Sequence, residues 1–496
     1  MLVTVSAHLS AAINTFFKKG RWNFPISMES GVILCIVFIC LSNYFFIRFY
    51  TNYLPCQIPW QQQHVPKNSG IRKSGVSNKK LKQCTFTTMK QFNVPIIYRS
   101  PLIAAIKNKR RQQDKMKKDF SPTVLDFGAV QIYLSRHFGF CYGVENAIDI
   151  AFRTIEENPG KRIFLLSEMI HNPQVNADLQ ERGVQFLQDT KGKQLIPFEA
   201  LSKDDVVIIP AFGTTLAIEE KLNSIGITTA KYNTTCPFVE KVWNRSEQIA
   251  TKQYTVIVHG KPTHEETRAT FSHAAHNTPT LIVNDMAETI LLSKYITGEK
   301  PSAAFYNEFK GRFSEGFDVE KDLQRIGVVN QTTMLASDTQ AIADYLKQVM
   351  LDKFTLTAAS IEERFADTRD TLCYATNDNQ TAVYGLLQTP ADLAIVVGGY
   401  NSSNTSHLVE LCESTLPTYF ISSEEKIMSS TEIMHYNFHT KQEITTVGFL
   451  PNKEPVKILL TSGASCPDAV VEEVINKLVS FYKVQHKLKH IINQFS

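Results

Sequence analysis

The feature that constrains this chain most is a regular alternation of short apolar runs and helical stretches, which starts near Ser121. The runs are continuously apolar, the pattern of strands covered on both faces. They predict strands at Arg162–Leu166, Asp205–Phe212, Thr255–His259, Thr280–Val283, Ile326–Val329, Leu393–Val397, Thr418–Ile421 and Lys457–Leu460. Between them, helices are predicted at Asn146–Glu157, Phe238–Lys252, Asp338–Leu351, Thr381–Gln388 and Ala469–Tyr482. This series predicts an α/β fold with mostly parallel sheets, in which functional residues gather at the carboxyl ends of strands.

The first 120 residues differ from this body in charge. They hold 19 Lys or Arg against 3 acidic residues, whereas residues 121–496 hold 33 against 45. Residues 1–50 contain an uncharged apolar run behind basic residues, which is typical of a signal peptide or signal anchor. Residues 51–120 are basic and nearly free of acids, as in a disordered transit peptide.

This leader predicts delivery through the secretory route into the stroma of a plastid, in particular a secondary, apicoplast-like plastid. A membrane-anchored protein with a basic linker is the alternative. An arm that binds nucleic acid is not favoured, because aromatic residues are sparse in residues 51–120. We therefore expect no nucleic-acid partner, and contact with membranes only through the leader during targeting.

The cysteines of the body are few and widely spaced. Five of the nine lie beyond residue 120, which is unlike a disulfide framework and favours free or metal-bound thiols. Cys141, Cys236 and Cys373 each follow a turn-like segment and precede a helical pattern, and helix N-termini favour the thiolate. A cysteine in such a setting, taken alone, is more often a small buried apolar side chain. Together they fit an iron–sulfur cluster with one open iron, or zinc, and their spacing does not decide between these metals.

Several sequence blocks around these residues carry a specific resemblance. The blocks are GFCYGV, MIHNPQV, NTTCPFVEKVW, HGKPTHEET, NQTTML, GGYNSSNTSHL and TSGASCPDAVVEEV. In this order, and over about Leu134 to Val474, the chain resembles 4-hydroxy-3-methylbut-2-enyl diphosphate reductase, the terminal enzyme of the non-mevalonate (MEP) isoprenoid pathway. The block HGKPTHEET and an insertion near residues 295–325 are closer to the cyanobacterial and plastid branch of that family.

The resemblance implies an iron–sulfur oxidoreductase with three similar α/β lobes in a pseudo-threefold arrangement around a central [4Fe-4S] cluster. Cys141, Cys236 and Cys373 are the implied ligands. The implied reaction removes the allylic hydroxyl reductively and gives isopentenyl and dimethylallyl diphosphate, with electrons from a ferredoxin-like donor. The expected lobes are residues 142–236, residues 237–370 with the insertion, and residues 371–480 with 125–141, followed by a C-terminal tail at 481–496.

The resemblance also implies roles for individual residues. Glu266 matches the proton donor, and a carboxyl group in a closed pocket is expected to have a raised pKa. Thr332 is the second implied catalytic residue, and Glu265 is expected to be an exposed neighbour. The implied substrate-binding residues are His171, His264, Gln331, Asn401, Ser402, Ser403, Asn404 and Ser465. Several of these follow apolar strands, where N–H groups can face an anion, although such residues are also common as helix caps.

Two positions depart from the family pattern. Phe212 stands where many bacterial members have a histidine, so phosphate contacts are expected to rest on His171 and His264. Tyr374 follows Cys373 where the family usually has an acid, which affects the tuning of a cluster and not its ligation. Two other functions stay open: a zinc-dependent hydrolase that uses the same cysteines and Glu266, and a non-catalytic iron–sulfur redox sensor.

Overall fold

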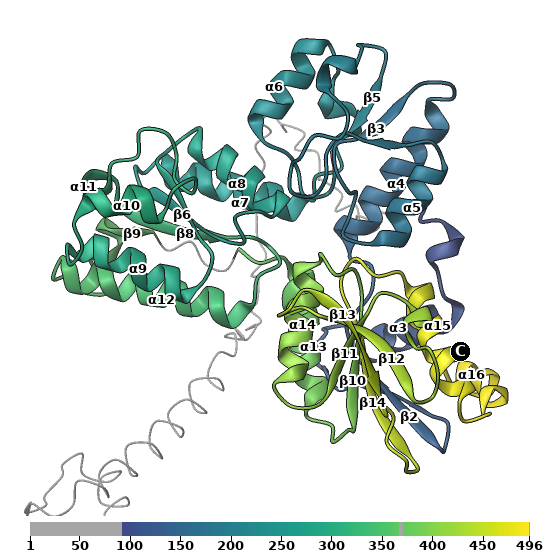
Figure 1. Cartoon of the computed structure of the whole chain (residues 1–496). Coiled ribbons are helices and arrows are strands. Elements are labelled where there is room, and N and C mark those ends of the chain that lie inside the picture. The colour runs from purple at the N-terminus through teal and green to yellow at the C-terminus, as the bar shows by residue number, and fades with distance from the viewer. Residues whose placement is uncertain (1–91, 367–370, 496) are drawn as a thin grey trace, which may run out of the picture. The chain divides into compact units, whose positions relative to one another are not determined.

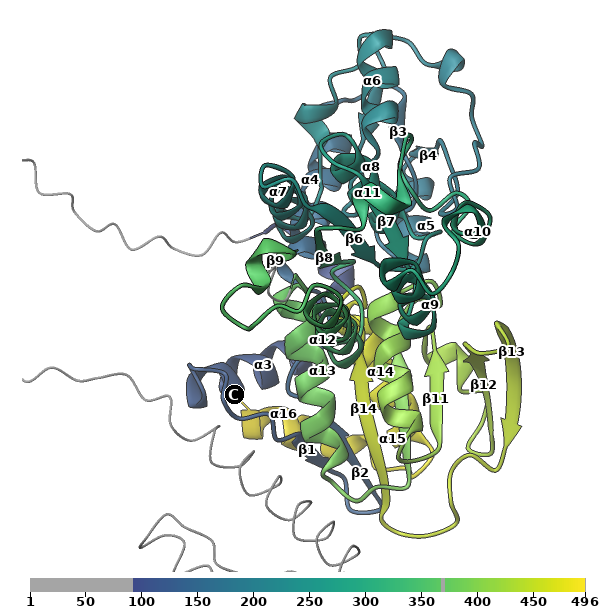
Figure 2. The same cartoon turned by 90° about the vertical axis from the view of Figure 1, so that its left-hand side faces the viewer.

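A computed structural model describes residues 92–366 and 371–495 of the chain. The chain divides into residues 1–87 and 88–496, and the described residues belong to the second unit. The expected signal segment and most of the basic leader therefore lie outside the described residues. The second unit is built from α/β layers with mostly parallel sheets, as predicted (Figures 1 and 2). Among the described residues, no helix has both the length and the apolar character needed to cross a membrane.

The first sheet has the parallel strand order β4-β3-β5. Its strands are β3 (Ile163–Leu165), β4 (Gln185–Phe186) and β5 (Val206–Ile208). The helices of this part of the chain are α4 (Tyr142–Glu157), α5 (Pro173–Glu181) and α6 (Leu216–Ile225). All residues of β3 and β5 are buried, which explains why both read as continuous apolar runs.

The second sheet is also parallel and has the order β7-β6-β8-β9. Its strands are β6 (Thr255–His259), β7 (Thr280–Val283), β8 (Ile326–Asn330) and β9 (Phe365–Ala366). Its helices are α7 (Pro237–Ala250), α8 (Glu265–Ala275), α9 (Met286–Thr297), α10 (Ser302–Glu308), α11 (Val319–Asp322) and α12 (Ala336–Lys353). Helices α10 and α11 lie in the range of the expected insertion, and the core of this sheet includes the stacked rings of Phe305, Phe309 and Phe317.

The third sheet has the order β1-β2-β14-β10-β11, with only the β1–β2 pair antiparallel. Its strands are β1 (Thr123–Asp126), β2 (Val130–Leu134), β10 (Leu393–Val397), β11 (Thr418–Ile421) and β14 (Val456–Ser462). Its helices are α13 (Tyr374–Leu387), α14 (Ser403–Glu413) and α15 (Asp468–Ser480), and an antiparallel hairpin joins β12 (Glu432–Asn437) to β13 (Gln442–Val447). The first and second sheets each fall within one residue range expected for a lobe, and so does the third except for Thr123 and Val124 of β1. The lobe boundaries themselves stay a prediction.

Two helices lie where the sequence predicted a disordered leader and a tail. Helix α3 (Pro101–Gln113) is in the range 51–120, and α16 (Leu488–Phe495) is in the range 481–496. Ser100 caps α3, and Leu102, Ile103 and Ile106 are buried against α15 and α16. The described part of the leader range is therefore folded, because one apolar face of α3 completes the core of the third sheet.

Candidate active site

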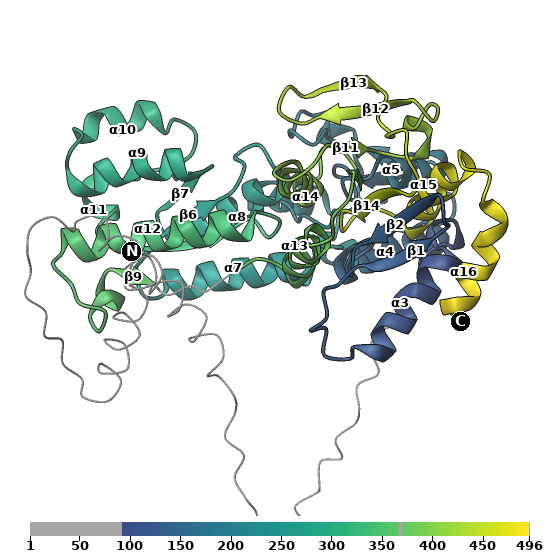
Figure 3. The ribbon, with the colours of Figure 1, turned by 90° about the horizontal axis from the view of Figure 1, so that it is seen from below.

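The three cysteines expected as ligands lie at the starts of three helices and line one cavity. Cys141, Cys236 and Cys373 are the N-cap residues of α4, α7 and α13, which come together in Figure 3. The Sγ of Cys373 accepts a hydrogen bond from the backbone N–H of Thr376, in the first turn of α13, at 3.3 Å. The Sγ of Cys373 also contacts the Thr376 hydroxyl at 3.1 Å. The three helix N-termini thus present three sulfurs to one space.

Gly143 allows α4 to approach the second cysteine closely. A Cβ atom built on Gly143 would lie 2.5 Å from the Sγ of Cys236 and 4.0 Å from the Sγ of Cys141. The first of these two distances is shorter than the contacts that real Cβ atoms make, whereas the second is an ordinary contact. The glycine is required here by a close approach, which also shows that two of the three thiols converge.

The donor set fits an iron–sulfur cluster. In the part of the chain that the structure describes, all five cysteines are free thiols. Burial raises the pKa of all three cavity thiols, to about 12 for Cys236, and the charges of the neighbouring sulfurs raise the pKa of Cys141 further. Three thiolates in this space therefore need a cation to balance them. Soft sulfur ligands with an open fourth position suit iron–sulfur or zinc chemistry. Cys412 and Cys466 are buried and are not part of the cavity lining.

Glu266 lies in the wall of the same cavity and is only 1% exposed. Burial raises the pKa of Glu266 to about 7, while hydrogen bonds from Thr332 act in the opposite direction. The backbone N–H of Thr332 donates to Oε1, and the carbonyl of Thr332 accepts from the N–H of Cys373 at 3.2 Å. Because Oε1 accepts this hydrogen bond, the geometry favours Oε2 as the position of a proton on Glu266. Thr332 therefore connects the carboxyl group to one of the three thiol positions.

Two histidines and a phenylalanine form the next part of the cavity wall. His264 is the N-cap of α8, and its Nδ1 accepts from the N–H of Glu266 at 3.1 Å. Burial lowers the pKa of His264, which favours the neutral ring with its proton on Nε2. The ring of Phe212 lies 4.3 Å from the ring of His171 and 5.5 Å from that of His264.

The expectation that Glu265 is exposed was wrong. Glu265 is 7% exposed, and its Oε2 lies 3.2 Å from Nε2 of His171, which draws the side chain inward. The ligand atoms of His171, His264 and Glu265 lie within 4.8 Å of one another and could hold a metal ion. These three residues form a second set of possible metal ligands, with nitrogen and oxygen donors, and share no residue with the set of three cysteines.

The turns at the starts of α14 and α15 supply neutral donors to the cavity. Ser402 caps α14 by accepting from the N–H of Thr405, and Ser465 donates to the carbonyl of His171 at 3.2 Å. The Oδ1 of Asn404 accepts from the N–H of Ala464 at 2.9 Å. Its Nδ2 is buried and, among the described residues, has no hydrogen-bond partner. An unpaired buried amide in a cavity wall is a donor for a ligand. Ser403 also lines the cavity.

The structure does not bring Gln331 and Asn401 to the cavity wall. Asn401 is exposed, because it precedes the cap of α14. Gln331 is buried, but its side chain bonds the N–H of Lys261 and the hydroxyls of Thr267 and Thr333, so it supports the loops around the site. Thr376 was not predicted as a site residue. It stands three residues after the N-cap Cys373, and its backbone N–H donates to the sulfur of Cys373. An N-cap side chain commonly accepts from the N–H at this position, so the spacing could have indicated it.

Comparison with known proteins decides the family. The model of the LytB protein family matches residues 132–479. This chain belongs to the LytB protein family. It is 42% identical over 352 residues to 4-hydroxy-3-methylbut-2-enyl diphosphate reductase of a Picosynechococcus strain, covering 71% of this chain and 84% of that one. The same enzyme of Prochlorococcus marinus is 39% identical over 388 residues, covering 78% of this chain and 92% of that one.

A solved structure shares the fold. The structure of the E-1-hydroxy-2-methyl-but-2-enyl-4-diphosphate reductase from Plasmodium falciparum matches with a TM-score of 0.50 and 23% sequence identity. The match covers 70% of this chain and 87% of that one. The family resemblance and the α/β fold expected from the sequence blocks are thereby confirmed.

Proposed function

We propose that this chain reduces 4-hydroxy-3-methylbut-2-enyl diphosphate to isopentenyl and dimethylallyl diphosphate, the last step of the non-mevalonate pathway. One observation carries the proposal: three free thiols from three helix starts line the same cavity as the buried Glu266 and the unpaired amide of Asn404. The names of the relatives support the substrate.

The resident cofactor in this proposal is a [4Fe-4S] cluster held by Cys141, Cys236 and Cys373. When bound, it supplies electrons one at a time and a Lewis-acidic position for the allylic hydroxyl. The chain contributes the surroundings of these ligands. Backbone N–H groups of α4, α7 and α13 stabilise the negative charge on the sulfurs, and the apolar residues Val144, Ile170 and Val239 of the cavity wall limit the entry of water.

Glu266 is the proposed proton donor. The reaction breaks the allylic carbon–oxygen bond, consumes two electrons and two protons, and releases the hydroxyl as water. With a pKa of about 7, a large share of Glu266 is protonated at neutral pH, while Thr332 fixes the carboxyl group through Oε1. A carboxyl group that is fully charged at neutral pH could not deliver this proton.

The diphosphate is proposed to bind to the cavity wall through neutral donors. Nε2–H of His264 and Nδ2 of Asn404 are the donors that the geometry leaves available. His171, Ser402, Ser403 and Ser465 line the same wall, and α14 adds the positive end of its dipole. Gln331 is proposed to hold the loop that carries Thr332, and no substrate contact is assigned to Asn401.

The experiment is anaerobic reconstitution of the full chain with iron and sulfide, followed by turnover of the hydroxylated diphosphate with reduced methyl viologen. Glu266→Gln is expected to keep the cluster and to lose about a hundredfold or more in kcat. The control is Glu220→Gln, which changes an exposed carboxylate on α6.

The two alternative functions predict other results in the same experiment. A zinc-dependent hydrolase would bind zinc and give no iron–sulfur colour. A redox sensor would bind iron but would not turn over the substrate, and Glu266→Gln would change nothing.

We also propose that the electron donor is a ferredoxin-like protein and that residues 1–91 direct the chain to a plastid, in particular an apicoplast-like one. The cyanobacterial relatives support a plastid-type origin. The test is the location of a fluorescent protein fused to residues 1–91 in a cell with a secondary plastid. Plastid fluorescence that is lost on removal of residues 1–50 is expected, whereas a signal at a cell-surface membrane would favour the anchored alternative.

A further inference from the structure

The described N-terminal segment is basic in a body that is otherwise acidic. Residues 92–120 hold 8 Lys or Arg against 2 Asp, whereas residues 121–496 hold 33 basic against 45 acidic residues. Most of this charge is concentrated at the end of α3 and in the loop that leads to β1. Arg111, Lys115, Lys117 and Lys118 are all exposed there. An acidic partner would be repelled by most of the body and attracted to this segment.

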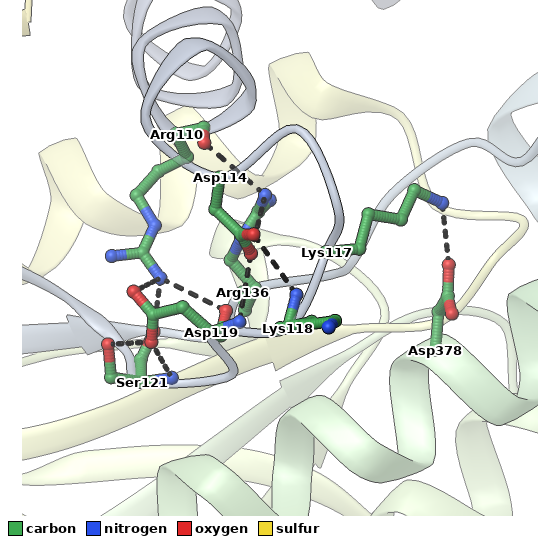
Figure 4. A network of polar contacts seen from close by, with 8 residues as sticks. All are labelled: Arg110, Asp114, Lys117, Lys118, Asp119, Ser121, Arg136 and Asp378. Atoms are coloured by element: carbon green, nitrogen blue, oxygen red, sulfur yellow. Dashed lines mark hydrogen bonds and ion pairs between the residues drawn. The ribbon is translucent and has the colours of Figure 1, made fainter. Parts of the chain in front are cut away.

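Polar contacts hold the loop in one place (Figure 4). Arg110 pairs with Asp119 at 3.1 Å and donates to the carbonyl of Ser121 at 2.8 Å. The carboxylate of Asp114 accepts from the backbone N–H groups of Lys118 and Asp119, at 3.1 and 2.9 Å. The side chains of Lys115 and Lys118 have no hydrogen bond or ion pair within the described residues. The loop thus has a fixed backbone with lysine side chains available to a partner.

The loop lies directly beside the thiol sites. Nζ of Lys117 pairs with Asp378 of α13 at 2.8 Å and lies 5.4 Å from the centre of the Tyr374 ring. Tyr374 follows Cys373, lines the cavity, and accepts a hydrogen bond from the N–H of Tyr142 at 3.1 Å. Tyr142 in turn follows Cys141. The basic loop is therefore joined directly to Tyr374, which follows one of the three cysteines, and through Tyr374 to Tyr142, which follows another.

The same place exposes apolar side chains. Met116 is 74% exposed, Tyr142 39% and Tyr374 37%, and Phe238 packs against Tyr374 with ring centres 4.9 Å apart. We call Lys115, Met116, Lys117, Lys118, Tyr142 and Tyr374 the lysine–tyrosine face. Exposed aromatic residues and methionine within a rim of charge are typical of protein interfaces.

We propose that the lysine–tyrosine face is the docking surface of an acidic protein that carries one electron at a time, such as a small iron–sulfur protein. The proposal rests on the proposed function, because the reaction needs two electrons from outside the chain. Each encounter delivers one electron at the edge of the cavity, beside Tyr374, which lines it. The oxidised carrier then leaves, and a second reduced carrier supplies the other electron.

The test reverses the two free lysine charges in the full chain, as Lys115→Glu with Lys118→Glu. Lys310→Glu with Lys347→Glu is the control, because it changes the net charge equally at exposed lysines, one in the turn after α10 and one on α12. A reduced plant-type [2Fe-2S] ferredoxin serves as the protein donor and reduced methyl viologen as the small donor. We expect the KM for ferredoxin at low salt to rise about tenfold or more in the first variant only. The rate with the dye should stay unchanged in both.

Two results would overturn the docking proposal. One is an unchanged KM for ferredoxin, and the other is an equal loss of the ferredoxin-driven and dye-driven rates, which would show that the lysines support the site itself. Binding of oxidised ferredoxin by calorimetry separates this proposal from the proposed function, since it needs no turnover. The first variant should weaken the measured Kd about tenfold, with the control unchanged, whether or not the chain reduces the diphosphate.

Discussion

Glu266 shows how burial of one residue can set a chemical role. Its neighbour Glu265 is also buried, but Glu265 faces His171, whereas Glu266 faces the backbone of Thr332. Burial is the largest cause of the raised pKa of Glu266, so the protonated form persists to about pH 7. Adjacent acids in one sequence block thus have different surroundings.

The rate with reduced dye should depend on pH through this group. Because the protonated carboxyl group is the donor, kcat should be constant on the acid side of pH 7 and should fall as pH rises through about 7. The measurement is the pH profile of kcat at saturating substrate, with the spectrum of the cluster recorded at each pH. A rate that stays constant through the alkaline range would contradict the role of Glu266.

Asn404 gives a second prediction at this scale. Asn404→Asp keeps the oxygen that accepts from Ala464 but replaces the unpaired amide donor by a group that repels phosphate. We expect the KM for the diphosphate to rise about a hundredfold, a cost near 3 kcal/mol, with an intact cluster. Asn401→Asp on the exposed preceding turn is the matched control. Equal effects of the two variants would show that Asn404 makes no direct contact.

At the scale of elements, the site depends on how closely three helix N-termini meet. Gly143→Ala would place a Cβ atom 2.5 Å from the Sγ of Cys236, so the sulfur or α4 must move. We expect this variant to fold but to lose most of its bound iron after reconstitution, measured by iron content and thermal unfolding. Glu156→Ala on the exposed side of α4 should keep its iron. Full iron content in Gly143→Ala would mean that the thiols do not need this approach.

The sequence predicted those elements whose pattern is local. The buried strands β6 and β8 read as continuous apolar runs, so their ends at His259 and Asn330 could be placed to within a residue. The hairpin β12–β13 was missed because its residues are mostly exposed or half-buried and mix polar with apolar side chains. Helix α3 was missed because its basic composition hid the apolar positions that it buries.

For the site, motifs were sufficient to find the residues but not the directions of their side chains. Cys141, Cys236 and Cys373 precede recognisable helices, and all three line the cavity. Gln331 occurs in an equally distinctive block, yet its side chain turns toward Thr267 and Thr333. Such directions depend on partners that are distant in the sequence, and no local pattern contains them.

At the scale of the whole molecule, the described N-terminal segment is part of the fold. Leu102 of α3 is fully buried in the core that includes α15 and α16. Leu102→Ala should lower the free energy of unfolding by about 2–5 kcal/mol, measured by urea denaturation, because it leaves a cavity in that core. Met116→Ala, at an exposed position of the following loop, should change it by less than about 0.5 kcal/mol. Equal stabilities would show that α3 is not packed as described.

The most direct measurement is the iron and sulfide content of the full chain and of five single Cys→Ser variants after anaerobic reconstitution. The parent chain should bind one iron–sulfur cluster. Changes at Cys141, Cys236 or Cys373 should each destroy it or reduce it to a partial cluster, while changes at the buried Cys412 and Cys466 should leave it intact. A cluster that survives loss of any of the first three thiols, or a chain that takes up only zinc, would contradict the account.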